Sequence, residues 1–155
     1  MNYALDKIDL KIIHLLQKDA KMKIKEIAAA LNMTNTPIFD RIKKLEQANV
    51  ITGYSARINK EKVGLHLVAF CSITLDKHNQ SNIRQFETEV KKLEEVIECY
   101  HIAGMVDYML KVVAKDMVEY QAFIATKLAA LDNIGRVQSS FVMTTVKNDG
   151  VLQLV

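Results

Sequence analysis

The sequence has few cysteines, no metal-ligand pattern and no long apolar run, and each absence excludes a class of protein. Its only two cysteines, Cys71 and Cys99, lie in separate apolar runs, which excludes a disulfide framework and predicts two small buried thiols. The four histidines show no ligand spacing with cysteines or acidic residues. We therefore predict no metal site and no cofactor.

The N-terminus shows no charged segment followed by an apolar leader, and no apolar run approaches the roughly 20 residues that a membrane span needs. These absences predict a cytoplasmic protein with no membrane partner. Half of the 155 residues are hydrophobic and a quarter are charged, which is ordinary for a chain that buries real cores. The length allows one domain or two small ones.

The charge is distributed unevenly along the chain. Residues 1–64 contain 12 Lys and Arg against 7 Asp and Glu, a net charge of +5. Residues 65–155 contain 9 against 11, a net charge of −2. This asymmetry indicates that the N-terminal part alone meets a polyanion.

Three helices are predicted in the basic part. Asp6 and Asp9 are spaced as a capping box, and the helix they begin should extend to about Lys18 because its apolar residues recur on one face. A short second helix is predicted over Ile24–Leu31. A third is predicted over Thr34–Gln47.

The third helix has the sequence of a recognition helix. Thr34 or Thr36 can cap it, and Pro37 falls in its first turn, where a missing N–H costs nothing. Two short helices joined by a tight connection, the second polar and basic on its outer face, are typical of a helix-turn-helix. The segment Ile51–Ile58 resembles a strand and could supply a wing.

Two interpretations of this basic outer face compete: a face that is merely solvated, and a face that binds double-stranded DNA. Hydroxyl, amide and cationic side chains contact phosphates and base edges, which favours DNA. Lysines also gather at the start of the second helix, where backbone phosphates would pass. The predicted DNA contacts are Lys21, Lys23, Lys25, Thr34, Asn35, Thr36, Phe39, Asp40, Arg41, Lys43 and Lys44.

Several motifs in order make the chain resemble the Lrp/AsnC family of bacterial and archaeal regulators along essentially its whole length. They are Leu5-Asp6-x-x-Asp9-x-Lys11-Ile12-Ile13-x-Leu15-Leu16-Gln17, Glu26-Ile27-Ala28, Thr34-x-x-Pro37-Ile38-x-x-Arg41-Ile42-x-x-Leu45-Glu46 and Val50-Ile51-x-Gly53-Tyr54. The resemblance implies a sequence-specific transcriptional regulator. One position departs from the family pattern: Lys23 replaces a small hydroxyl residue, which removes a helix cap of about 1 kcal/mol and adds a cation.

The spacing of apolar residues along the sequence changes in the C-terminal half. Alternating residues, two apolar helical patterns and the Gly104 turn predict the order β-α-β-β-α-β, a split βαβ arrangement. The predicted fold class is therefore α+β. A winged helix-turn-helix domain (residues 1–52) is followed by a hinge (53–64) and a ferredoxin-like βαββαβ, RAM-type domain (65–155) for oligomerisation and effector binding.

Both helices of such a domain cover one face of the sheet, so the other face should be polar or find a partner. Neither alternating set is polar, since the less apolar one still holds Val68, Phe70, Val113, Val142 and Val146. A sheet that is apolar on both sides predicts a homodimer. A two-fold dimer would also present two recognition helices to half-sites about 34 Å apart, or a multiple of that. The resemblance implies further assembly to an octamer.

The segment between the two middle strands could be a plain hairpin turn or an effector site. The resemblance implies that Gly-x-x-Asp-Tyr lies in a pocket between dimers where a small amino acid binds as effector. Main-chain N–H groups near a glycine suit a carboxylate, and Asp107 could accept from an α-ammonium. The predicted effector residues are Tyr100, Gly104, Met105, Val106, Asp107 and Tyr108.

Two other functions compete with DNA-binding regulation. Siroheme decarboxylases resemble Lrp-type regulators along their length, and His66 and His101 could serve such an enzyme. A stand-alone amino-acid-binding protein is the second alternative. The basic third helix argues against both, so we predict a protein that is not an enzyme.

Overall fold

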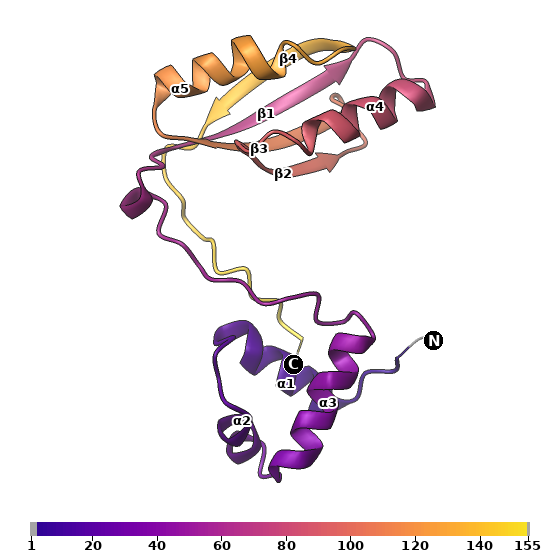
Figure 1. Ribbon diagram of the computed structural model, residues 1–155, viewed down its shortest axis with the longest axis vertical. Coiled ribbons are helices and arrows are strands. Elements are labelled where there is room, and N and C mark those ends of the chain that lie inside the picture. The colour runs from indigo at the N-terminus through magenta and orange to yellow at the C-terminus, as the bar shows by residue number, and fades with distance from the viewer. Residues whose placement is uncertain (1–2, 155) are drawn as a thin grey trace. The chain divides into compact units, whose positions relative to one another are not determined.

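The computed structural model describes residues 3–154, which divide into two compact units (Figure 1). The first unit contains the chain up to Arg57 together with the segment from Lys147 onward, and the second runs from Ile58 to Val146. The C-terminal segment thus groups with the N-terminal helices, whereas the predicted division assigned it to the domain of residues 65–155. Among the described residues, no helix has both the length and the apolarity to cross a membrane.

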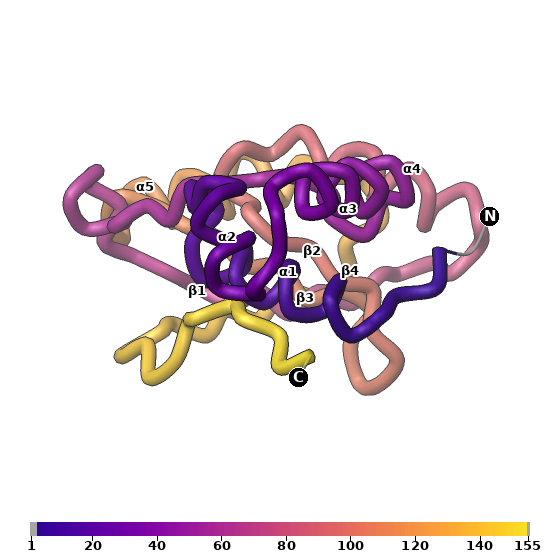
Figure 2. The backbone as a smooth tube through the Cα atoms, turned by 90° about the horizontal axis from the view of Figure 1, so that it is seen from below, coloured from indigo at the N-terminus to yellow at the C-terminus, as the bar shows by residue number. Residues whose placement is uncertain are grey.

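Three helices form the first unit: α1 (Lys7–Lys18), α2 (Ile24–Ala30) and α3 (Asn35–Gln47) (Figures 1 and 2). The predicted capping box is confirmed, since the Asp6 carboxylate accepts from the Asp9 N–H and the Asp9 carboxylate accepts from the Asp6 N–H. These two bonds satisfy N–H groups that the first turn of a helix leaves without partners.

A small apolar core holds the three helices together. One face of each helix contributes to it, and its buried members are Ile12, Leu16, Ile27, Ala28, Ile38 and Leu45. The C-terminal segment joins the same unit through Gln17 of α1. The Gln17 amide accepts from the Leu152 N–H at 2.8 Å and donates to the Leu152 carbonyl at 3.3 Å.

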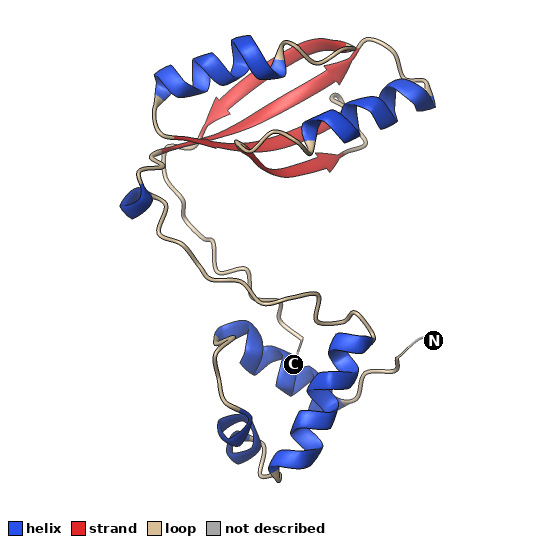
Figure 3. Ribbon diagram, in the orientation of Figure 1, coloured by secondary structure: helices blue, strands red, loops and turns tan. Residues whose placement is uncertain are grey.

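The second unit begins with a short 3₁₀ turn, Glu61–Val63, and then alternates strands and helices (Figure 3). Its elements are β1 (Leu67–Leu75), α4 (Gln80–Val90), β2 (Val96–His101), β3 (Tyr108–Ala114), α5 (Met117–Ala122), the π-helical turn η2 (Phe123–Leu128) and β4 (Ile134–Phe141). The strands pair antiparallel in the order β2-β3-β1-β4. This order is the predicted ferredoxin-like arrangement.

Both helices cover one face of the sheet, as Figure 3 shows. The residues of β1 and β3 that face them alternate along each strand and are buried, so the core lies between the sheet and the helix pair. Within this core the Tyr120 hydroxyl donates to Ser139 Oγ and lies 3.0 Å from Cys71 Sγ. Cys71 is therefore a buried thiol, as predicted.

Three local predictions were wrong. Cys99 is exposed because β2 is an edge strand of the sheet. The last strand ends at Phe141, so Val146, counted above among the apolar residues of the sheet, lies beyond it, while the Val142 N–H still donates to the Val68 carbonyl at 2.9 Å. The segment Ile51–Ile58 forms no strand, since extended chain becomes a strand only where a neighbour pairs with it.

The sheet face opposite the helices is apolar only in its centre. Alternation places Val68 and Phe70 of β1 on this face, where they pair with Val113 and Lys111 of β3. The Lys111 ammonium lies 2.8 Å from a Glu98 carboxylate oxygen on β2. The β4 residues of this open face are polar, namely Arg136, Gln138 and Ser140. The open face is thus an apolar strip beside an ion pair and a polar edge.

Candidate nucleic-acid interface and effector segment

The outward face of α3 exposes the predicted hydrogen-bonding and cationic side chains together. Thr36, Asp40, Lys43 and Lys44 are all exposed, while Ile38 on the opposite side is fully buried. Among residues 3–154, no ion pair engages either lysine. The face therefore presents two uncompensated cations beside groups that can contact base edges.

Arg41 of α3 has a different environment from its neighbours. Its guanidinium donates to Asp6 at 2.6 Å and to Asp9 at 2.7 Å, so it ties α3 to the start of α1. The Asp9 carboxylate is buried and also accepts from the Tyr3 hydroxyl. Of the predicted DNA contacts, Arg41 is the one that forms an ion pair among the described residues.

The contacts of Asp6 with Asp9 and Arg41 lower the pKa of the Asp6 carboxyl group. The N–H of Asp9, which donates to it, is the largest cause of a lowered pKa, and the Arg41 guanidinium adds to the effect. Because the carboxylate ionises more readily in the folded protein, its contribution to stability is present above the ordinary Asp pKa. That contribution is lost as the pH falls through the lowered value.

Lys21, Lys23 and Lys25 lie at the start of α2, as predicted, and are exposed. Lys23 occupies the N-cap position without a side-chain oxygen to accept a hydrogen bond. Only half of a capping box forms there, in which the Lys23 N–H donates to the Glu26 carboxylate at 2.7 Å. The predicted loss of a cap at this position is therefore real, and a cation stands in its place.

In the second unit, Asp107 lies where the turn after β2 meets the end of β1. Its carboxylate accepts from the Leu75 N–H at 2.7 Å, and both of its oxygens lie 3.0 Å from Nε2 of His78. The Leu75 N–H is the largest cause that lowers the pKa of Asp107, and His78 lowers it further. Asp107 is thus an anion at neutral pH, placed at the rim of the sheet.

The other predicted effector residues do not share one environment. Tyr108 is buried under α4, where its hydroxyl donates to Glu87 at 2.9 Å and its ring stacks on His101 at 4.6 Å. Tyr100 is exposed on the open sheet face and donates to Glu98. Met105 is fully exposed, and Gly104 has open space around it. Only the Asp107 part of this segment combines fixed geometry with charge.

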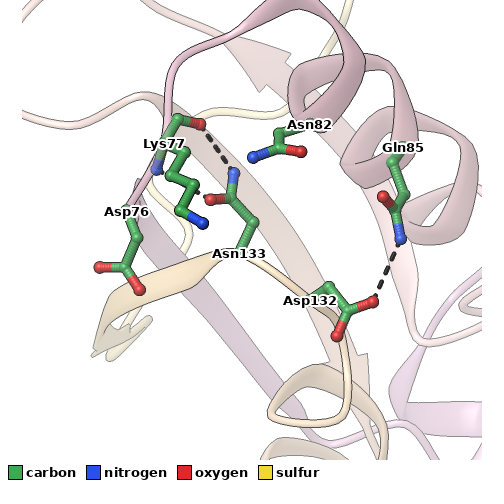
Figure 4. Close-up of a pocket in the computed structure, with 6 residues that line it drawn as sticks. All are labelled: Asp76, Lys77, Asn82, Gln85, Asp132 and Asn133. Atoms are coloured by element: carbon green, nitrogen blue, oxygen red, sulfur yellow. Dashed lines mark hydrogen bonds between the residues drawn. The ribbon is translucent and has the colours of Figure 1, made fainter.

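A polar hollow of about 340 Å³ lies against the loop that follows β1 (Figure 4). Its lining comes from that loop, from α4 and from the turn before β4, and consists of Asp76, Lys77, Asn82, Gln85, Asp132 and Asn133. The Asn133 amide holds the loop by bonding to both the N–H and the carbonyl of Lys77. None of the predicted effector residues lines this hollow.

Comparison with known families covers both units. A model of the winged helix-turn-helix DNA-binding fold matches residues 5–52, and the model described as the Lrp/AsnC ligand binding domain matches residues 68–152. The chain belongs to the Lrp/AsnC family. It is accordingly a DNA-binding transcriptional regulator with a ligand-binding domain.

Relatives of this Lrp/AsnC protein match it over nearly their full length. The leucine-responsive regulatory protein of Escherichia coli is 34% identical over 96% of this chain and 90% of its own. The Bkd operon transcriptional regulator of Pseudomonas aeruginosa is 32% identical over 92% of this chain and 93% of its own. A transcriptional regulator of Neisseria meningitidis, solved as a complex with L-Met, has a TM-score of 0.93, 30% identity and 97% coverage of both chains.

Sequence reasoning missed two partners of the effector segment in this Lrp/AsnC chain, His78 and Glu87. Both act across the fold, since His78 contacts Asp107 29 positions away and Glu87 contacts Tyr108 21 positions away. A split βαβ order pairs the first strand with the third, and this pairing could have indicated His78 because it places the end of β1 beside the start of β3. No local pattern indicates Glu87.

Proposed function

We propose that this regulator binds its operator through the outward face of α3, with phosphate contacts from the lysines at the start of α2. The observation that carries this proposal is the pair Lys43 and Lys44, whose ammonium groups are exposed without an ion-pair partner among the described residues. Cations in this position neutralise phosphates, while the first turns of a recognition helix reach base edges. Arg41 is assigned instead to positioning α3.

A double variant, Lys43→Ala with Lys44→Ala, tests the proposal. We expect the affinity for the protein's own promoter region to fall at least about tenfold, and the slope of log affinity against log salt to decrease by about 2 per protomer, because two phosphate contacts no longer release counterions. Retardation of labelled DNA at four salt concentrations measures both. The matched control removes two lysines from the second unit, Lys91→Ala with Lys92→Ala. Equal affinities and slopes for the two double variants contradict the proposal.

We further propose that a small amino acid binds near Asp107 and modulates assembly or DNA affinity. Asp107 is ionised at neutral pH and lies at the rim of the sheet, so its carboxylate suits an α-ammonium group. His78 now occupies both carboxylate oxygens, so an effector would have to displace it or share the carboxylate with it. The names of the E. coli and N. meningitidis relatives make L-leucine and L-methionine the first probes.

Asp107→Asn should abolish the response to the amino acid while leaving the fold intact. The amide oxygen can still accept from the Leu75 N–H, whereas the negative charge that attracts the ammonium is gone. The measurement is the shift of the melting temperature with each amino acid. Asp76→Asn, which removes a carboxylate from the same end of β1, is the control and should respond like the wild type. An unchanged response in Asp107→Asn, or no response of the wild type to any amino acid, contradicts the proposed effector site and does not affect the proposed DNA binding.

We also propose that the protein is a homodimer that assembles further to an octamer. The apolar strip of the open sheet face, in which Phe70 is 36% exposed and Val68 half-buried beside the buried Val113, supports the dimer. Two-fold symmetry would give each operator two half-sites. The enzyme and stand-alone sensor alternatives predict no retardation of DNA, so the lysine experiment also separates them from regulation.

A further inference from the structure

Phe39 is an apolar side chain on the polar side of α3. The other large apolar residues of the helix, Ile38, Ile42 and Leu45, pack against the core of the first unit. The Phe39 ring points away from that core and is 42% exposed. It lies between Thr36 and Lys43 on the face proposed to meet DNA, within the first two turns of the helix.

A second observation shows that this ring is held in place. The Lys43 ammonium lies 4.7 Å from the centroid of the Phe39 ring, one helical turn further along. A cation at this distance over an aromatic face is attracted by the ring quadrupole. Lys43 therefore restrains the ring from one face, and the residue remains 42% exposed.

The chemistry of the major groove limits what such a ring can contact. Base edges present hydrogen-bond donors and acceptors there, and the thymine 5-methyl is the apolar group among them. An aromatic ring offers neither a donor nor an acceptor to the polar edges. We propose that Phe39 is a specificity-determining residue that contacts the 5-methyl group of a thymine in each half-site, with Lys43 restraining its ring.

This inference rests on the proposed DNA binding by α3, and deoxyuridine separates the two. Deoxyuridine pairs like thymidine and lacks only the 5-methyl group. A DNA fragment that the full-length protein selects from a random pool is prepared once with thymidine and once with deoxyuridine throughout. The wild type should bind the deoxyuridine fragment roughly fourfold more weakly for each lost contact, or roughly fifteenfold for two half-sites, as the burial of one methyl-sized group implies.

Phe39→Ala, tested on the same two DNA fragments, completes a double-mutant cycle between the ring and the thymine methyl group. This variant should bind the thymidine fragment more weakly than the wild type does, and it should bind the two fragments equally, because the contact that distinguishes them is gone. Phe39 is exposed, so the melting temperature of the variant should stay that of the wild type. Lys43→Gln serves as the matched control: it should weaken binding to both fragments through the lost phosphate charge and should lower their ratio only in part. A scan of single thymidine-to-deoxyuridine changes should place the effect at one symmetric position.

Each outcome decides between the two proposals. If the wild type binds both fragments equally, or if Phe39→Ala keeps the full preference for thymidine, the role of Phe39 is overturned while DNA binding by α3 stands. If the wild type selects no fragment from the pool, both proposals fail. A preference lost in Phe39→Ala and mapped to one symmetric position supports the inference.

Discussion

Arg41→Met should lower the stability of the first unit by about 2–4 kcal/mol, although Arg41 lies on the surface of a helix. Removing one partner of a buried ion pair costs about 3–5 kcal/mol, and the partial exposure of Arg41 reduces that figure. The Asp9 carboxylate is 1% exposed and, within residues 3–154, would keep only the Tyr3 hydroxyl and the Asp6 N–H as donors. For a domain this small, each kcal/mol shifts the melting temperature by about 4–8 °C.

The measurement is thermal unfolding followed by circular dichroism, with Lys44→Met as the matched control. Lys44→Met removes the same charge from the same helix without touching the Asp6 and Asp9 carboxylates, so its melting temperature should remain that of the wild type. If the two variants unfold at the same temperature, Arg41 does not hold α3 against α1.

A second substitution distinguishes positioning from direct contact with DNA. Asp9→Asn in the Arg41→Met background removes the unpaired buried charge and keeps an oxygen that accepts from the Asp6 N–H. We expect the double variant to regain most of the lost stability, and operator affinity to return with it. Stability that returns without affinity would instead make Arg41 a DNA contact in its own right.

Arg41 also illustrates which features a sequence of this kind can predict. The capping box at Asp6 and Asp9 was predictable because it depends on a spacing of three residues. The same two carboxylates also pair with the guanidinium of Arg41, which lies 35 and 32 positions further along the chain. This contact depends on how α1 and α3 pack. Sequence periodicity gives the faces of both helices but not the side chains that meet between them.

In the second unit, too, local features were predictable from the sequence and contacts between elements were not. Its strand and helix order was predictable from changes of period, and the antiparallel order β2-β3-β1-β4 follows the split βαβ pattern. The end of β4 was not predictable, because Val146 continues the apolar alternation after the strand has ended at Phe141. Tyr108 was predicted at an effector site because of its motif. Its burial beneath α4 depends on Glu87 and Phe86 of that helix, which no local pattern reveals.

Phe70→Glu should convert the proposed dimer into a folded monomer. In the open sheet face, Phe70 lies opposite Lys111 of β3, so a carboxylate at this position gains a cross-strand partner while the chain is monomeric. In the dimer the new carboxylate would be buried against the apolar strip and would lose its hydration. Lys111 already pairs with Glu98, so it would neutralise this buried charge only in part. The substitution therefore opposes association more than folding.

Operator binding should fall by a larger factor than the roughly tenfold expected for the Lys43 and Lys44 double variant. A dimer binds its second half-site as an intramolecular step, and linking two binding modules in this way raises affinity by about 10²–10⁴-fold. Sedimentation velocity and DNA retardation on the same samples measure the assembly state and the affinity. Thr88→Glu on the exposed side of α4 adds an equal charge away from the open sheet face and should leave both unchanged. If Phe70→Glu remains a dimer, the strip around Val68, Phe70 and Val113 is not the dimer interface. If it is a monomer of undiminished affinity, the two recognition helices do not act as a pair.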